Sequence, residues 1–222
     1  LVVHNRQTPA TDLATRGGGG LTISAGARVV NCRIESNASV YQGAGVFMNS
    51  ADCLLRNCLI LNNSSTGASY GGGGIRFRFD NAGTVESSTI VSNYAYVNGG
   101  GIDARDNGIR LVNCILYANR CNQSQYNNYR ADSSTKSIAF TNCCFTPALS
   151  TSYDDYSADN IADNPQFADA DYRLSRQSPC VNNGINQAWM GAALDLDGRP
   201  RLDGIHQQAD IGCYEYPFPG QV

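Results

Sequence analysis

The stretch GGGIDARDNGIRLVNCILYAN, residues 99–119, combines a run of glycines, a Val-Asn-Cys triplet and a later Asn, and the chain repeats this combination. Four copies are clear and a fifth, near residue 142, is weaker. The second positions of the triplets are Asn31, Asn57, Ser87, Asn113 and Asn142, so the steps are 57 − 31 = 26, 87 − 57 = 30, 113 − 87 = 26 and 142 − 113 = 29 residues. Repeats of about 20 to 50 residues are typical of solenoids. The chain is therefore predicted to be a solenoid.

Apolar residues alternate with polar ones inside each copy. Val46 and Met48, or Ile75 and Phe77, follow the glycines at every second position, and the residues before each triplet alternate in the same way. A period of two predicts strands, and no stretch sustains a helical period. Three short strands per turn predict a parallel β-coil with strands about 4.8 Å apart and a right-handed crossover. We expect five to six coils.

Asparagine and glycine are expected at the bends between strands. Asn tolerates the left-handed backbone conformation, and stacked Asn side chains can bond from coil to coil. A structural ladder is therefore predicted at Asn31, Asn57, Asn113 and Asn142. The glycine runs are interpreted as bends and not as phosphate-binding loops, because no P-loop Lys and no helix start follow them.

The repeated Gly-Gly-x-Ile and Ile-x-x-Asn phrases resemble the right-handed parallel β-helix repeats of pectate-lyase-like proteins and bacterial polymorphic outer-membrane adhesins. NPQFADADYRLSRQSPCVNNG and DLDGRPRLDGIHQQADIGCYEY resemble the C-terminal segment of secreted, surface-anchored bacterial β-helix proteins. This resemblance implies an all-β, single-stranded parallel β-helix over residues 1–145. It also implies a capping tail over 146–222, packed on the last coils in the same domain, and a secreted or bacterial cell-surface location. It leaves the activity open, because such helices carry lyases, hydrolases, epimerases and adhesins.

Composition narrows the partners. The net charge is −3, the isoelectric point is near 5.3, and Lys136 is the only lysine among 16 basic residues, so nucleic-acid binding is not expected. No stretch is apolar enough to span a membrane. The opening LVVHN reads as the end of a coil, with Val2 and Asn5 aligned to Ile34 and Asn37. We therefore expect further coils, a signal and an anchor upstream, and a monomeric protein.

The nine cysteines fall into two groups. Cys32, Cys58, Cys114 and Cys143 share one repeat position with Ser88, which predicts a column of small buried side chains. A disulfide or metal column remains the alternative, although zinc is disfavoured because His4 and His206 are the only histidines. The resembled tail usually has small residues where Cys180 and Cys213 stand, which implies a disulfide between them. Cys121 with Cys144 is a weaker pair, and Cys53 is expected to be free.

A ligand surface is predicted on the outward side of the strand after the glycines. Neighbouring coils place Arg76 beside Asp103 and Arg78 beside Arg105. The adjacent loops carry tyrosines, namely Tyr41, Tyr70, Tyr94, Tyr96, Tyr126 and Tyr129. Rings beside guanidinium groups suit a polysaccharide or cell-surface glycan, and an arginine ledge favours an acidic one. The alternative interpretation is an ordinary polar face whose tyrosines cover loop backbone.

Catalysis is the competing hypothesis. Asp80, Asp103 and Asp106 fall near the end of one strand on neighbouring coils, and a glycoside hydrolase needs two carboxylates about 5 to 9.5 Å apart. A calcium-assisted lyase would need a base such as Arg105. The alternative is that these Asp residues cap bends.

No cofactor is expected. Asp195-Leu196-Asp197-Gly198 is a weak match to a calcium loop because the later ligands are missing. Arg199 or Arg201 is instead predicted to pair with Asp210 or Glu215. Non-catalytic binding of a glycan or surface partner is the predicted function, and polysaccharide cleavage is the alternative.

Overall fold

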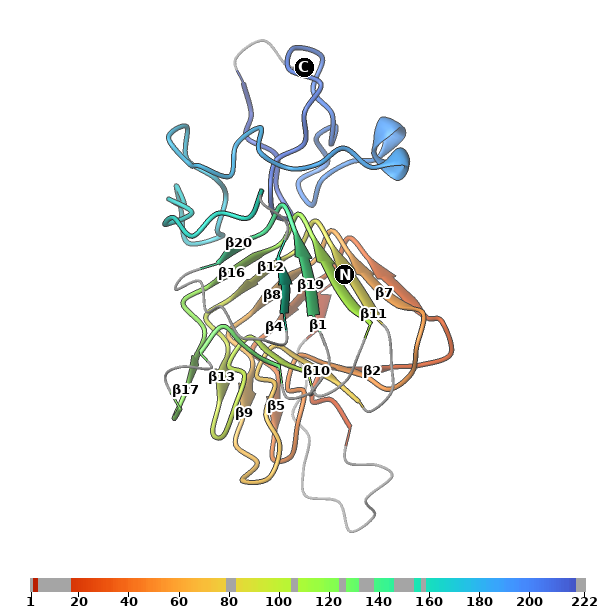
Figure 1. Ribbon diagram of the computed structural model, residues 1–222, viewed down its shortest axis with the longest axis vertical. Helices are drawn as coiled ribbons and strands as arrows, with labels where there is room; N and C mark the ends of the chain where they lie inside the picture. The colour runs from red at the N-terminus through yellow and green to blue at the C-terminus, as the bar shows by residue number, and fades with distance from the viewer. Residues whose placement is uncertain are drawn as a thin grey trace.

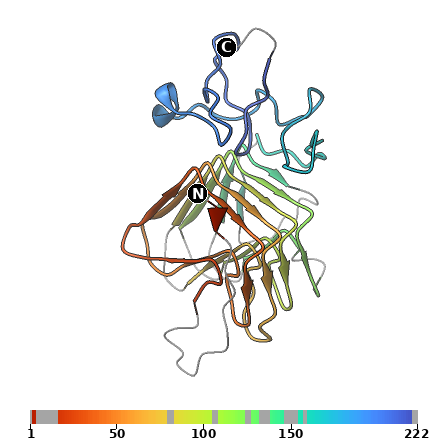
Figure 2. The ribbon, with the colours of Figure 1, turned by 180° about the vertical axis from the view of Figure 1, so that it is seen from behind.

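The chain folds as a parallel β-solenoid of the right-handed type. The computed structural model describes residues 2–3, 17–78, 83–104, 108–123, 127–131, 138–145, 154–156 and 159–218. These residues contain no α-helix, and their only helical segment is the 3-10 helix η3 (Ala188–Ala192). Figure 1 shows the strands stacked in parallel layers, with the C-terminal tail running along one side of the stack, and Figure 2 shows the same arrangement from behind.

Strands of successive turns stack into four parallel sheets. The first sheet contains β2 (Leu21–Ile23), β6 (Val46–Met48), β10 (Ile75–Phe77), β14 (Ile102–Ala104) and β18 (Tyr129–Ala131). The second contains β3 (Arg28–Val30), β7 (Cys53–Arg56), β11 (Gly83–Glu86), β15 (Ile109–Val112), β19 (Ile138–Thr141) and β21 (Asp154–Tyr156). The third contains β1 (Val2–Val3), β4 (Arg33–Glu35), β8 (Leu59–Leu61), β12 (Thr89–Val91), β16 (Ile115–Tyr117) and β20 (Cys144–Phe145). The fourth contains β5 (Ala38–Ser39), β9 (Ser64–Ser65), β13 (Tyr94–Ala95) and β17 (Arg120–Cys121).

The β-helix prediction is confirmed, with two corrections to its geometry. A turn has four strands and not three, because the fourth strand has two residues and is too short to produce an alternation. The described residues form about four turns and not five to six. Strands β18, β19 and β20 add part of a further turn.

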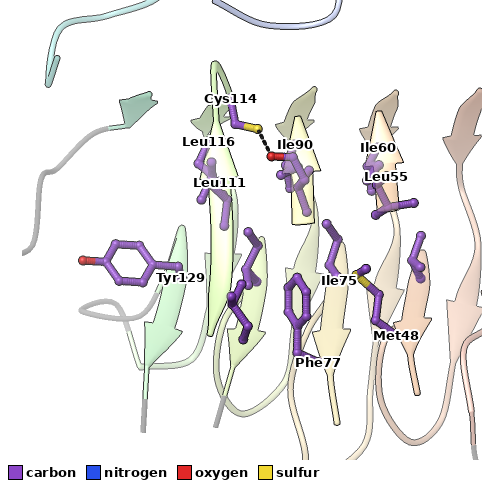
Figure 3. Packing of buried hydrophobic residues seen from close by; sticks show 14 of the residues in the cluster. Met48, Leu55, Ile60, Ile75, Phe77, Ile90, Leu111, Cys114, Leu116 and Tyr129 are labelled. Carbon is purple, nitrogen blue, oxygen red and sulfur yellow. Dashed lines mark hydrogen bonds between the residues drawn. The ribbon is translucent and has the colours of Figure 1, made fainter. Parts of the chain in front are cut away.

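In the core, side chains at equivalent positions of successive turns stack on one another. Strand register places Leu55 beside Val85 and Ile60 beside Ile90, and each of these side chains is fully buried. Figure 3 shows these stacks converging from facing sheets, together with the Cys114 thiol, which bonds to the Val85 carbonyl at 3.4 Å. The cysteine column therefore lies inside the core, as predicted.

Aromatic rings close the core at the last turn. Tyr129 lies 5.0 Å from Phe140 between ring centroids, and Phe140 lies 4.8 Å from Phe145. The expectation of a surface loop at Tyr129 was wrong, because β18 pairs with β14 and stacks Tyr129 beside Ile102 inside the core. These rings cover the apolar interior at this end.

The bend column adopts the predicted conformation. Asn31, Asn57, Asn113 and Asn142 all have positive φ, between 46° and 56°, and Ser87 replaces Asn at 42°. Amide stacking is limited here to Asn57 Nδ2, which donates to Asn31 Oδ1 at 2.7 Å. The Asn113 side chain instead exchanges two hydrogen bonds with the backbone of Ile185 in the tail. This column mainly holds the tail.

The continuous amide ladder is formed by the other Asn of the repeat. Asn37, Asn63 and Asn93 each donate from Nδ2 to the Oδ1 of the next Asn at 2.9 Å, as far as Asn119. Asn119 Nδ2 extends the ladder to Asn128 at 3.1 Å. All five are buried. The ladder therefore runs inside the wall, at a column that the sequence prediction did not select.

Strand β1 pairs with β4 one residue away from the predicted alignment. Val3, not Val2, lies beside Ile34, and the Val3 carbonyl accepts from Asn37 Nδ2 at 2.9 Å. A shift of one residue exchanges the two faces of a strand. It is Val3 that is buried.

The tail extends along the third sheet over all turns. Its contacts begin at Arg33 Nη1, which bonds to Asp171 at 2.8 Å, and reach Asn142 Nδ2, which donates to Asn183 at 3.2 Å. Between them, Cys213 and Tyr214 pack on Leu59 and Val91. We expected a cap on the last coils, and the contacts extend further. The division of the chain at residue 145 stays a prediction.

The tail does not contain the expected disulfide. Cys180 and Cys213 are both free thiols, and they belong to different buried clusters. Cys121 and Cys144 are also free. Cys213 packs against Leu59, whereas Cys180 packs against Ile115, so the two lie over different turns.

Candidate functional site

The first sheet carries the charged row that the sequence predicted. In-register pairing places Arg76 beside Asp103, and Asp103 beside Arg130 of the following turn. Arg76 Nη1 forms an ion pair with Asp103 Oδ2, and the Gly71 amide donates to the same oxygen at 3.0 Å. The predicted juxtaposition of Arg76 and Asp103 therefore exists.

This row lies beneath the chain and not on the surface. The side chains of Arg76 and Asp103 are 1% and 0% exposed. The turn before β10 covers them: Gly72 has φ +82°, and a Cβ there would meet the Ile75 carbonyl oxygen at 2.5 Å and Arg76 Cβ at 2.9 Å. Only glycine permits this close approach without strain. Arg76 and Asp103 are consequently sealed from a large ligand, and they hold the turn from within.

Arg130 extends the row and was not selected from the sequence. Its Nη1 lies 3.9 Å from Asp103 Oδ1, and it lies 2.6 Å from the end of the Asn98 side chain, to which it donates when the Asn98 amide is oriented with its oxygen toward Arg130. The side chain is 14% exposed. Its position was hidden because residues 120–137 contain no repeat signature that would indicate β18. Two guanidinium groups thus flank one carboxylate in the row.

Tyrosines of the covering turns are the exposed part of this region. We define the tyrosine turns as residues 66–73, which carry Tyr70, and 96–101, which carry Tyr96. Tyr70 is 36% exposed and Tyr96 is 49% exposed. The guanidinium carbon of Arg76 lies 5.6 Å from the Tyr70 ring centroid, within the range of a cation–π contact. The buried row therefore positions an exposed ring.

The remaining predicted binding residues are dispersed. Arg78 is exposed, and its Nη1 donates to Asn49 Oδ1 at 2.7 Å. Tyr41 is half-buried in the preceding turn, where its amide donates to Ser39 Oγ. Arg105 lies outside the described residues, so its pairing with Arg78 stays a prediction.

Of the three carboxylates in the catalytic hypothesis, Asp103 alone lies in the described part of the chain, and its surroundings do not suit catalysis. Asp80 and Asp106 lie outside the described residues. Asp103 is fully buried, is paired with Arg76 and accepts the Gly71 amide, so it offers no open position for a sugar. The described residues therefore do not assemble the carboxylate pair.

A second cluster of ionisable groups lies inside the tail. Arg201 is fully buried and its Nε lies 3.0 Å from Glu215 Oε1, which confirms the predicted contact between these two residues. Burial raises the pKa of Glu215 to about 9 and that of Asp210 to about 6. Both carboxyl groups contact backbone amides: Asp210 N donates to Glu215, and Tyr216 N donates to Asp210 at 2.6 Å. The cluster ties separate segments of the tail together.

The Asp195–Gly198 segment is a turn held by ion pairs. Asp195 Oδ1 accepts the amides of Asp197 and Arg199, at 2.9 and 2.7 Å. Arg199 Nη1 and Arg173 Nε each lie 2.7 Å from Asp197 Oδ2. Among the described residues, no three His, Cys, Asp or Glu side chains are arranged to hold a metal ion.

Comparisons with known proteins add no family to this architecture. A scan of protein families and searches of curated proteins and solved structures found no match to the chain. Within the described ranges, no helix has the length and apolar character needed to cross a membrane. The site and its chemistry carry the functional argument.

Proposed function

We propose that this β-solenoid binds an acidic glycan on its tyrosine turns and does not cleave it. The observation that carries the proposal is Tyr70, a ring that is exposed and yet positioned from below by Arg76. A ring fixed before binding loses little side-chain entropy when a sugar stacks on it. Tyr96 adds a second exposed ring on the next turn.

The charge beneath these rings supports an acidic ligand. Arg76 and Arg130 both approach Asp103, so two guanidinium groups lie beneath the rings. Charges under a low-dielectric layer are screened less than surface charges. Arg78 adds an exposed guanidinium that can hold a carboxylate in bidentate fashion. An extracellular or cell-surface location suits such a ligand and is part of the proposal.

The test is a glycan array of acidic and neutral polysaccharides, combined with assays for reducing ends and unsaturated products. Wild-type protein is expected to retain acidic glycans and to release no products. Replacing Tyr70 by Ala should weaken binding by about 1 kcal/mol, or about fivefold in Kd. Tyr216→Ala in the tail, on the opposite side of the solenoid, is the matched control and should bind as wild type does.

Two results would contradict the proposal. If the protein binds none of the acidic glycans, acidic glycans are excluded as its ligand class. If products are released, the protein cleaves the polysaccharide and does not only bind it. Variants of Asp80 and Asp106 would then identify the catalytic carboxylates.

A further inference from the structure

Two cysteines face each other where the tail meets the last turn. Strand register places Cys144 beside Ile115, on the face of the third sheet that packs against the tail, whereas its neighbour Phe145 faces the core. Cys180 comes from the tail and lies in the same buried cluster as Cys144 and Ile115. Both cysteines are 0% exposed. Cys180 and Cys144 therefore pack together at the junction of the tail and the third sheet.

The backbone on both sides of this pair is fixed. Cys144 forms a parallel bridge with Ile161, whose amide donates to the Cys143 carbonyl at 2.9 Å. The Ile211 amide donates to the Cys180 carbonyl, also at 2.9 Å. Hydrogen bonds therefore hold the backbone that carries each of the two cysteines.

The core cysteines have a less suitable geometry for such a bond. Cys32 and Cys58, like Cys114 and Cys143, occupy the same position of successive turns, directly before strands that pair in parallel about 4.8 Å apart. Their Cβ atoms point in the same direction and are separated by about the same distance, whereas disulfides require about 3.8 Å. Cys144 comes from the third sheet and Cys180 from the tail that packs on it, so this pair does not share the parallel stacking of the core cysteines.

We propose that Cys144 and Cys180 form a disulfide that links the tail to the last turn when the protein folds under oxidising conditions. Oxidised glutathione is a sufficient oxidant. One thiolate attacks it to give a mixed disulfide and releases one glutathione thiol. The second thiolate then attacks the protein sulfur and releases the other glutathione. Two protein thiols are oxidised and one glutathione disulfide is reduced.

The bond should form during folding. The contact with Cys180, and then burial, raise the pKa of the Cys144 thiol, so the reactive thiolate is scarce in the folded protein. Before the tail docks, both thiols are accessible to the oxidant.

The test compares full-length protein refolded with a glutathione redox buffer or with a reductant. Free thiols are alkylated, and linked peptides are mapped by mass spectrometry. A Cys144–Cys180 peptide is expected only after oxidative refolding, and the melting temperature should then be roughly 5 to 15 °C higher. Cys213→Ala, which removes a buried tail cysteine outside the pair, should keep both effects. Cys180→Ala should lose both.

Three outcomes would overturn the proposal. Alkylation of both Cys144 and Cys180 after oxidative refolding excludes the bond. A bond from either residue to another cysteine, or a bond within the core column, shows that the pairing is wrong. If Cys180→Ala fails to fold, the peptide maps of the wild type and of Cys213→Ala still show whether the Cys144–Cys180 bond forms.

Discussion

Replacement of Asn63 by Ala removes the centre of the amide ladder. Asn63 is 1% exposed, and its Oδ1 accepts from both the backbone amide and Nδ2 of Asn37, at 3.0 and 2.9 Å. Its Nδ2 donates to the Ile34 carbonyl and to Asn93 Oδ1, both at 2.9 Å. The substitution therefore deletes four side-chain hydrogen bonds within the wall.

The expected cost follows from the groups that remain. Asn93 Oδ1 keeps the Asn63 backbone amide as a donor, at 3.0 Å. The Asn37 backbone amide and the Asn37 Nδ2 group each lose one buried hydrogen bond, although Nδ2 keeps the Val3 carbonyl as an acceptor, and each such loss costs about 1 to 3 kcal/mol. We expect Asn63→Ala to lower the free energy of unfolding by about 4 kcal/mol.

Urea denaturation followed by circular dichroism measures this change, provided that the slope of the transition is the same in both proteins. Asn49→Ala is the matched control, since the Asn49 side chain bonds to the exposed Arg78, and it should cost about 0.5 kcal/mol. A difference between the two variants below about 1 kcal/mol would refute the ladder as a source of stability.

Three further predictions test the buried charges and a close backbone contact. Asp103→Asn removes the carboxylate that pairs with the buried Arg76 and should destabilise the protein by about 3 kcal/mol. The double variant Arg76→Met with Asp103→Leu should restore most of that loss. Equal melting temperatures for the single and the double variant would contradict this. The raised pKa values of Glu215, about 9, and Asp210, about 6, mean that the folded state holds protons that the unfolded chain releases, so stability should fall as the pH rises from 5 to 8. Glu215→Gln should reduce that fall by up to about 1.4 kcal/mol per pH unit in denaturant titrations, and an unchanged slope would show that Glu215 is ionised when folded. Gly71→Ala would place a Cβ 1.7 Å from the Asn98 carbonyl oxygen and should lower the melting temperature by several degrees, in contrast to Gly191→Ala, where no atom lies within 4 Å.

The repeat pattern was sufficient to predict the solenoid and much of its register. Alternation put Arg76 and Asp103 side by side, and the structure pairs them. It could not show that they are buried, because the path of the turn over β10 depends on Gly72 and on contacts between turns, not on the period of the strand.

The sequence does contain a signal that distinguishes the two Asn columns. Asn occupies positions 37, 63, 93 and 119 without a break, whereas Ser87 interrupts the other column. An unbroken column is what a continuous ladder requires, and the structure places the ladder there.

The tail could not be placed from its sequence. Its path is irregular, and its docking depends on single contacts such as Asn113 with Ile185 and Arg56 with the Trp189 ring, at 4.3 Å. Such contacts have no period. The same reason explains why the expected Cys180–Cys213 pair was wrong.

Hydrogen–deuterium exchange with and without an oligogalacturonate tests the proposed function most directly. Bound acidic sugar should slow exchange at the amides of the tyrosine turns, residues 66–73 and 96–101, and leave the tail unchanged. Tyr70→Ala should need a higher ligand concentration for the same protection. Unchanged exchange in both turns at saturating ligand, or protection confined to residues 159–218, would contradict the account.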